Sequence, residues 1–366
     1  MDPSIFDDIR PYNDSEIPDA LRRIAQHDLI PQVLRFIYPH EDPRDSMDRL
    51  LSIRGAHELQ STFMLDAIRR IVQTTSTGFT FSGLDNIKRG RPYLFISNHR
   101  DITLDAFLLQ KLFLDRGGEA SYIVFGNNLI DTPLMRDLFL CNNMIQMERG
   151  GGNPIAFYRS LQHLSQYLHY IIAEKQQSVW IAQKNGRSKD GVDSTAPAII
   201  KMLLLGSDKP ATEAVADLHI VPVAISYEWD PCDLMKSNEL YLKAHGGYEK
   251  VEGEDYNSVV TGIIGQKGKI HLAIGKPLTS AELRCADDHE VADHVASVLD
   301  QRIQHLYHLM PTNYLAHDLL TGSNRYRQYY SADVKNAFTQ RMASLDEGRR
   351  QIMLKMYANP VISAKR

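Results

Sequence analysis

The chain has 366 residues, of which 43% are hydrophobic and 23% are charged, so a disordered, collagen-like or coiled-coil protein is excluded. Its formal net charge of −4 gives no overall attraction to nucleic acid. The three cysteines, Cys141, Cys232 and Cys285, lie far apart and lack the spacing of a zinc site or a disulfide framework. We therefore expect a reducing cytoplasmic location, no nucleic-acid partner and no metal.

The N-terminal region predicts helices and no targeting segment. The first twenty residues are acidic and lack the basic stretch and apolar run of a secretory signal. No apolar run reaches the roughly 18 residues that span a membrane. Helical spacing of apolar residues occupies 19–25, 29–38 and a longer segment that begins near Ala56. The last segment is amphipathic, and we expect its apolar face to pack on the core or, alternatively, to lie on a membrane surface.

After Gly83 the pattern changes to short apolar runs separated by helical segments. Runs with the length and composition of strands occupy residues 93–97, 122–125, 179–182, 219–227 and 269–274. Helical spacing occupies residues 104–114, 155–173 and 198–205. This alternation predicts an α/β fold with a mostly parallel sheet flanked by helices, in which the loops at strand ends carry function.

The C-terminal part of the chain is predicted to be helical. A helix near 291–309 ends at Pro311, and the tail from Ser331 to Arg366 is helical and ends in basic residues. Those charges form either a solvated surface or an attraction to anionic lipid headgroups. We expect an N-terminal helical region at 1–78, an α/β domain at 79–310 and a C-terminal helical extension at 311–366.

The polar loop after the first predicted strand is the strongest candidate for chemistry. It contains Asn98, His99, Arg100 and Asp101, and Asp105 follows in the next helix. A histidine at such a junction can act as a general base near neutral pH, with a nearby carboxylate fixing its tautomer. Taken alone, the loop is equally typical of a helix cap, in which Asp101 accepts hydrogen bonds from free backbone N–H groups.

Three further polar segments follow apolar runs, at 126–129, 146–150 and 183–191. They carry Arg149, Lys184, Arg187 and Lys189, which place positive charge near the candidate base. Guanidinium groups match phosphate oxygens in geometry, and lysine adds a point charge, so these residues indicate a phosphate-bearing alcohol as substrate. The alternative for the third segment is an exposed turn. The Gly-Lys-Ser/Thr ending of a nucleotide-binding P-loop is absent.

Four segments, in order, resemble the sequence blocks of the glycerophospholipid acyltransferases, the family that includes 1-acylglycerol-3-phosphate acyltransferase and glycerol-3-phosphate acyltransferase. The segments are NHRDITLD, GNNL through MERG, QKNGRSKDG and IVPVAISYE, within Gly83 to Pro277. The resemblance implies a glycerol-3-phosphate acyltransferase-like α/β fold. It also implies acyl transfer from acyl-CoA or acyl-carrier protein to a glycerol phosphate hydroxyl, with no metal or bound cofactor.

The resemblance also implies roles for single residues. His99 would take the proton of the hydroxyl as its oxygen attacks the thioester. Arg149 and Arg187 match block arginines that hold the acceptor phosphate, and Pro222 matches a proline that shapes the acyl side of the site. The other residues expected to bind substrate are Asn98, Arg100, Asn127, Asn128, Lys184, Asn185, Gly186 and Ser188.

The chain departs from the family pattern at two places. The family aspartate follows the histidine after four residues, whereas five residues separate His99 from Asp105 and one separates it from Asp101. We favour Asp105 as the partner, since one extra loop residue can return it to the same position. The third block usually has a glutamate before its glycine and arginine, where this chain has Lys184 and Asn185, and an asparagine cannot supply a carboxylate charge.

The favoured hypothesis is acylation of 1-acylglycerol 3-phosphate, a step of phospholipid biosynthesis. We expect it to take place at the inner, cytoplasmic face of the membrane. The chain would bind that surface peripherally, through the amphipathic helix or the basic tail. One alternative is another acceptor, such as glycerol 3-phosphate, another lysophospholipid or an aminoacyl lipid. A second is a lipid-binding homologue without turnover. A serine hydrolase is disfavoured because no Gly-x-Ser-x-Gly motif is present.

Overall fold

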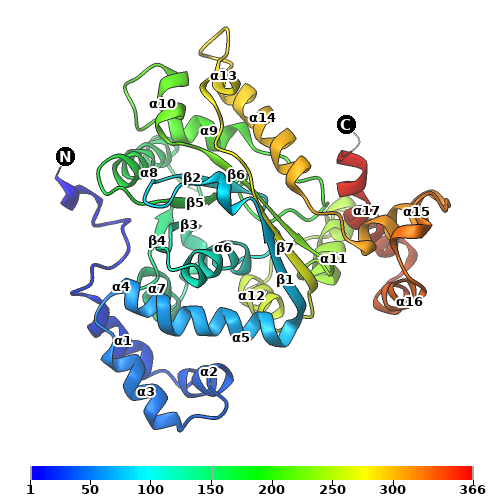
Figure 1. The fold of residues 1–366 in the computed structure, drawn as a ribbon, viewed down its shortest axis with the longest axis horizontal. Coiled ribbons are helices and arrows are strands. Elements are labelled where there is room, and N and C mark those ends of the chain that lie inside the picture. The colour runs from blue at the N-terminus through cyan, green and yellow to red at the C-terminus, as the bar shows by residue number, and fades with distance from the viewer. Residues whose placement is uncertain (1, 151, 365–366) are drawn as a thin grey trace.

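The protein is built around a seven-stranded sheet, seen in Figure 1. The structure, a computed structural model, describes residues 2–150 and 152–364. The strand order is β1-β7-β6-β2-β5-β3-β4, and every neighbouring pair is parallel except β6 and β7. The strands are β1 (Ser76–Ser82), β2 (Leu94–Ser97), β3 (Tyr122–Gly126), β4 (Met144–Met147), β5 (Val179–Ala182), β6 (Val221–Tyr227) and β7 (Gly268–Ile274). The fold is therefore the mostly parallel α/β sheet flanked by helices that the sequence predicts.

Helices cover both faces of the sheet. One face packs on α5 (Leu65–Thr75), α6 (Leu104–Asp115) and α7 (Pro133–Leu140). The other packs on α8 (Pro154–Ala173), α9 (Pro197–Leu204), α10 (Ala211–Asp217), α13 (Ser280–Leu283) and α14 (Val291–Leu306). Because both faces are covered, the central strands are apolar throughout, as parallel strands usually are.

Separate apolar clusters hold the two ends of the chain. The N-terminal cluster joins α1 (Ile17–Ala25), α2 (Ile30–Ile37), α3 (Pro43–Ser52) and α4 (Ala56–Leu59). The C-terminal cluster joins α15 (Pro311–Thr321), α16 (Ala332–Arg341) and α17 (Glu347–Ser363). Two more helices, α11 (Asp233–Ala244) and α12 (Glu254–Ile264), lie between β6 and β7 in the sequence.

Two strands and several helices were not expected from the sequence. The edge strand β1 has the sequence STGFTFS, and its side chains are exposed or half-buried, so it lacks an apolar run. The opposite edge strand, β4, is only four residues long. The helices α11 and α12 also escaped prediction, although both contribute to the site described below.

The amphipathic segment that begins at Ala56 packs on the core rather than presenting a free apolar face. It runs as α4, a π-helical turn at Gln60–Met64 and α5. Its residues Leu59, Phe63, Ile68 and Ile71 are buried. Among the described residues, no helix is both long enough and apolar enough to cross a bilayer.

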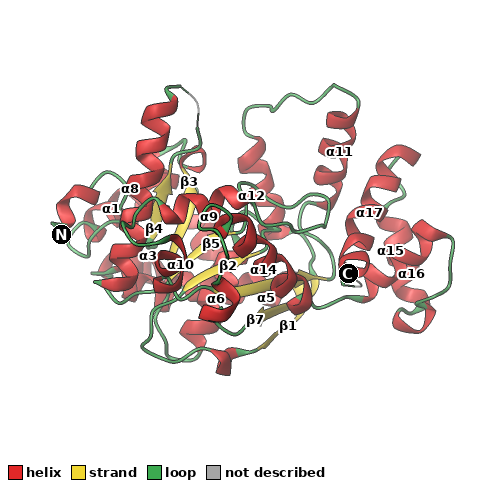
Figure 2. Cartoon of the chain, turned by 90° about the horizontal axis from the view of Figure 1, so that it is seen from above, coloured by secondary structure: helices red, strands yellow, loops and turns green. Residues whose placement is uncertain are grey.

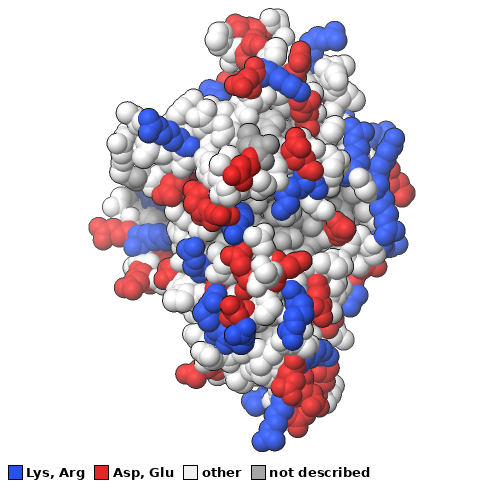
Figure 3. Space-filling model, turned by 90° about the vertical axis from the view of Figure 1, so that its left-hand side faces the viewer, with Lys and Arg blue, Asp and Glu red and all other residues white. Residues whose placement is uncertain are grey.

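The charged surface is mixed in sign. On the face that Figure 3 shows, acidic and basic side chains are interspersed. In the basic tail, Arg349 pairs with Asp346 and Arg350 pairs with Glu347, while Lys365 and Arg366 lie outside the described residues. The arginines of the tail are therefore partly neutralised by acids of their own helix.

The three thiols are predicted to differ sharply in reactivity. Cys141 and Cys232 are buried and Cys285 is half-buried. Burial raises the pKa of Cys141 to about 12 and also raises the pKa of Cys232, and the reactive species is the thiolate. In the native protein we expect rapid reaction of one thiol per chain with a disulfide reagent such as dithionitrobenzoate, and reaction of all three after unfolding. The variant Cys285→Ser should lose the rapid phase, and rapid modification of all three native thiols would contradict this assignment.

Candidate active site

The candidate active site lies where four neighbouring parallel strands end. Strands β2, β5, β3 and β4 are adjacent, so their carboxyl ends meet at one edge of the sheet. The loops that follow these strands carry, in the same order, His99, residues 184–187, residues 127–128 and Arg149. Helices α8, α11 and α12 project on this side of the sheet (Figure 2). Ligands of open α/β sheets bind at such an edge.

His99 contacts the carboxylate of Asp105. Its Nδ1 lies 2.9 Å from Asp105 Oδ2, and its side chain is 11% exposed while that of Asp105 is fully buried. The ring of Trp180 meets the imidazole edge-on, with the centroids 5.8 Å apart. A carboxylate at Nδ1 favours the proton on that nitrogen and leaves Nε2 free to accept one.

Asp105 receives three further hydrogen bonds. Its Oδ2 accepts the backbone N–H groups of Arg100 at 2.5 Å and Asp101 at 2.9 Å. Its Oδ1 accepts the hydroxyl of Tyr227 at 2.7 Å, and burial together with this carboxylate raises the pKa of Tyr227 well above its usual value. The carboxylate thus holds the histidine, the loop and strand β6 together.

Asp101 occupies a different position from Asp105. Its Oδ1 accepts the N–H groups of Thr103 and Leu104 at 2.9 and 2.8 Å, at the start of α6. Its Oδ2 is buried without a hydrogen-bond partner in the described protein. Burial, with a contribution from Asp105, raises the pKa of Asp101. The geometry therefore pairs His99 with Asp105 and gives Asp101 the capping position.

A cavity of about 50 Å³ opens beside His99. One part of its wall is polar and includes Arg149, Lys184, Asn185 and Gly186. The rest is apolar and comprises Ile102, Ala106, Phe107, Ile123, Val124, Phe125, Leu129, Phe139, Met144, Met147, Trp180, Ile181, Ala182 and Ile199, with Thr103 and Gly126 between them. The cavity thus offers cationic groups at one end and apolar surface at the other.

Two arginines at the site have unused hydrogen-bonding capacity. Arg149 Nε and Arg187 Nη1 are buried without a partner, and neither side chain forms an ion pair within the described ranges. Burial lowers the pKa of Arg149, while Asp255 opposes the shift. Gly126 makes room for Arg149, because a Cβ atom there would lie 2.1 Å from Arg149 Nε. Buried N–H donors without partners on guanidinium groups favour an anionic ligand.

Seven of the eleven residues expected to bind substrate do not line this cavity, namely Arg187, Asn127 and Asn128 and four residues with internal contacts. Asn98 ties β2 to β6 through both hydrogen bonds to the backbone of Ile225. Arg100 is buried among carboxylates on the far side of the loop, and Ser188 donates its backbone N–H to His99 O at 2.6 Å. Pro222 lies inside β6, opposite Ile96. Their contacts are internal, so they shape the loops that carry the site.

Asn127 and Asn128 lie at the rim of the site. Asn127 donates to Glu148 Oε2 at 2.9 Å and Asn128 donates to Asp255 Oδ2 at 2.8 Å. Asp255 belongs to α12, and Ser258 of the same helix accepts a hydrogen bond from Arg187 at 3.1 Å. Helix α12 is therefore bonded to two of the loops that form the site.

An apolar groove adjoins the cavity, and sequence reasoning missed it. The groove has a volume of about 550 Å³ and runs between the N-terminal helices and α12. It shares Thr103, Phe107 and Phe139 with the cavity at His99. Its rim includes five large apolar side chains with exposed fractions of 38 to 65%: Leu29, Val33, Phe36, Tyr256 and Ile264. The apolar residues of α12 at 259, 260, 263 and 264 were the available sequence signal.

The comparisons with known proteins bear on this arrangement. Residues 78–226 match the family model described as Acyltransferase. Among solved structures, the chain is similar to the 1-acyl-sn-glycerophosphate (LPA) acyltransferase PlsC from Thermotoga maritima, with 15% sequence identity and a TM-score of 0.39, over 78% of this chain and 92% of that chain. No curated protein matches the chain.

The stretch that matches the family model contains the loops that carry His99, Arg149 and Arg187, but it ends before Tyr227. Tyr227 and the α12 residues Asp255 and Ser258 therefore lie beyond the matched stretch. Within the residues that the structure describes, no group of three or more histidine, cysteine, aspartate or glutamate side chains is arranged to hold a metal ion.

Replacement of the two aspartates near His99 is expected to affect the acyl-transfer rate differently. All four groups that face Asp105 are N–H or O–H donors, so the amide of Asp105→Asn places its NH₂ against at least one of them. We expect Asp105→Asn to lower the acyl-transfer rate roughly a hundredfold or more, because orientation of the base is lost. The variant Asp101→Asn keeps an acceptor for the two N–H groups and should keep most of the activity. Rates of both purified variants, with melting curves as the folding control, decide this; a larger loss in Asp101→Asn would reverse the assignment.

Proposed function

We propose that this acyltransferase moves a fatty acyl group from acyl-CoA or acyl-carrier protein to a hydroxyl of 1-acylglycerol 3-phosphate. The main support is one juxtaposition. A histidine held by a buried carboxylate lines a cavity that has Arg149 in its wall and that adjoins an apolar groove. An anionic headgroup and a fatty chain are the two parts of a lysophospholipid, and each has a matching surface beside the same base.

In the proposed reaction, His99 Nε2 takes the proton of the acceptor hydroxyl as its oxygen attacks the thioester carbonyl. The tetrahedral intermediate collapses, the carbon–sulfur bond breaks, and the imidazolium returns its proton to the leaving thiolate. Asp105 stabilises the charged imidazolium through Nδ1 and keeps the ring in orientation. The four hydrogen bonds on Asp105 support this role, because they prevent the carboxylate from turning away.

The headgroup phosphate is proposed to bind Arg149 and Arg187. Both guanidinium groups have buried N–H donors without a protein partner, and Lys184 adds a further cation on the cavity wall. Arginine recognises phosphate oxygens through paired, charge-assisted hydrogen bonds. Bound phosphate would satisfy donors that burial otherwise leaves unpaired.

The fatty chains are proposed to use the apolar groove. It meets the cavity at Phe107 and Phe139, so a chain lying in the groove can place its polar end near His99. Exposed apolar side chains at its rim, such as Phe36 and Ile264, support peripheral docking on the cytoplasmic face of a membrane, where a lipid can enter without crossing water. The largely buried apolar face of the segment near 56–72, which includes Phe63 and Ile68, forms one wall of this groove.

A second acceptor is favoured by one observation. Lys184 and Asn185 stand at the cavity where the resembling family has a glutamate, so the headgroup side of the site carries more positive charge. Glycerol 3-phosphate or another lyso-lipid is therefore tested beside 1-acylglycerol 3-phosphate. A homologue that binds lipid without turnover is the remaining alternative.

The deciding experiment measures release of free thiol from acyl-CoA and acyl-carrier-protein donors. Each donor is combined with 1-acylglycerol 3-phosphate, with glycerol 3-phosphate and with no acceptor. We expect acceptor-dependent release that falls roughly a hundredfold or more in His99→Ala, because general base catalysis is lost. Lys209→Gln, which removes an exposed cation that pairs with Asp217 and lines neither the cavity nor the groove, serves as the control. Thiol release by wild type that is equal in His99→Ala would remove His99 as the base, and binding of lipid with no release for any pair would support the inactive alternative.

The membrane surface is tested by flotation with vesicles. The double variant Val33→Ser, Phe36→Ser removes apolar groups from α2 at the rim of the groove, and we expect it to float with phosphatidylglycerol vesicles much less than wild type. The matched control, Leu319→Ser with Tyr329→Ser, removes equally exposed apolar groups on the C-terminal helical region and should float normally. Equal flotation of both double variants would argue against docking through the groove. If wild type floats equally well with neutral phosphatidylcholine vesicles, electrostatic attraction to anionic lipid does not contribute to docking.

A further inference from the structure

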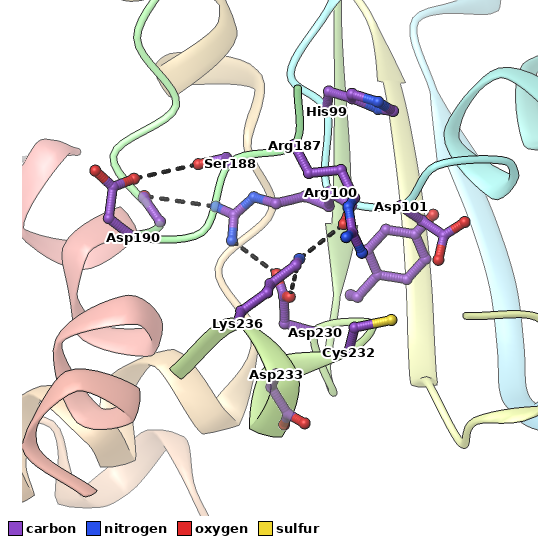
Figure 4. Close-up of polar contacts among 12 residues, drawn as sticks. His99, Arg100, Asp101, Arg187, Ser188, Asp190, Asp230, Cys232, Asp233 and Lys236 are labelled. Atoms are coloured by element: carbon purple, nitrogen blue, oxygen red, sulfur yellow. Dashed lines mark hydrogen bonds and ion pairs between the residues drawn. The ribbon is translucent and has the colours of Figure 1, made fainter. Parts of the chain in front are cut away.

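A cluster of buried charges lies beneath the loop that carries His99. The guanidinium of Arg100 pairs with Asp193 at 2.6 Å and with Asp230 at 2.9 Å. The ammonium of Lys236 pairs with Asp230 and donates to Arg100 O at 2.7 Å. All four side chains are at most 6% exposed. Figure 4 shows that Arg100 and His99 leave the loop in different directions, so the base faces the cavity while its neighbour is anchored in the interior.

The cluster continues into the C-terminal helices. Arg341 of α16 binds Asp233 through Nε at 2.5 Å and Nη2 at 2.8 Å. Tyr357 of α17 donates its hydroxyl to Asp233 at 2.7 Å and accepts the backbone N–H of Asp230 at 2.8 Å. Tyr357 therefore connects the carboxylate held by α16 with the residue that pairs with Arg100.

The charges of the cluster balance. Asp193, Asp230 and Asp233 face Arg100, Lys236 and Arg341. Burial opposes the charged form of Asp193, but Arg100 outweighs it and lowers the pKa of that carboxyl. The pKa of Arg341 is raised because Asp233 outweighs its burial. Both shifts favour the charged forms of Asp193 and Arg341.

Helix α17 also contacts the loop that carries Arg187. Gly191 lies so close to α17 that a Cβ atom there would be 2.0 Å from Met356 O, and its φ of +77° favours glycine. Asn359 donates to Asp190 O at 2.7 Å. Earlier in the same loop, Ser188 N–H donates to His99 O. The C-terminal helix thus contacts the base loop by a second route that avoids the charges.

Stability alone does not account for these charges. A buried ion pair loses hydration, and apolar residues of similar volume usually stabilise a fold as well or better. What ion pairs supply is direction, because each partner accepts the other in few geometries. Here Asp193 and Asp230 hold the side chain of Arg100, the residue next to His99, and Lys236 holds its carbonyl.

We propose that Arg341 and Tyr357 are positioning residues, through which the C-terminal helices α16 and α17 hold the His99 loop in its productive geometry. The proposal rests on the proposed role of His99 as base. Neither residue touches the cavity, and both act through Asp230, Asp233 and Lys236. The helices outside the acyltransferase match are thereby part of the catalytic unit.

The protein contains a matched control for this proposal. At the other end of the chain, Tyr12 donates to Asp137 at 2.7 Å, and Arg23 binds the same carboxylate through Nε at 2.8 Å and Nη2 at 2.7 Å. This Tyr-Asp-Arg group has the same chemistry as the group at Asp233, but it joins the N-terminal segment to α7. The test compares Tyr357→Phe and Arg341→Gln with Tyr12→Phe and Arg23→Gln in the full chain.

Two readouts are measured on each variant. In steady-state acyl transfer we expect Tyr357→Phe and Arg341→Gln to lower kcat roughly tenfold to a hundredfold, with little change in KM, because a shift of the base by about 1 Å impairs attack more than binding. Reaction of His99 with diethyl pyrocarbonate, followed by peptide mass spectrometry, should become faster in the same variants. The controls at Tyr12 and Arg23 should change neither readout, whatever their melting temperatures.

The outcomes separate this proposal from the proposed function. If kcat falls equally in the two groups of variants, or in neither, the C-terminal helices do not position the base. If wild type releases no thiol with any donor, the proposed function fails, and the diethyl pyrocarbonate rates still decide the positioning. Unchanged modification of His99 in Tyr357→Phe and Arg341→Gln would overturn the inference in that case.

Discussion

The arrangement of the site depends on the buried carboxylate of Asp105. It collects a ring nitrogen, two backbone N–H groups and a phenol, which come from the loop after β2 and from β6. A carboxylate removed from water must be satisfied in this way, since burial without partners strongly opposes its charge. The same contacts that satisfy Asp105 therefore fix the position of His99.

Helix α12 connects the loops of the site with the groove. It directs Asp255 and Ser258 toward the loops with Asn128 and Arg187, and it directs apolar residues into the groove. Its polar side chains are therefore bonded to the loops of the site, while its apolar side chains form one wall of the groove.

The sequence predicted the features that depend on local patterns. Apolar runs marked five of the strands, including β5 at its observed bounds, and polar residues at their ends marked His99, Arg149 and Arg187. It did not predict β1, because an edge strand needs no continuous apolar run. Asn98 and Arg100 looked like ligand residues because polarity in a loop does not show which way a side chain points. The groove joins residues as distant as Val33 and Ile264, so only the tertiary fold brings its walls together.

Several residues that orient the site lie beyond the stretch that matches the family model. The match ends at Ser226, whereas Tyr227 holds Asp105, Asp230 and Lys236 hold Arg100, and Ser258 holds Arg187. The residues that would carry the chemistry thus lie inside the matched stretch, and many of those that orient them lie beyond it. A buried charge depends on its partner, because losing one member of a pair leaves the other unpaired at a cost of about 3–5 kcal/mol. The matched stretch and the helices that follow it are therefore one structural unit at the site.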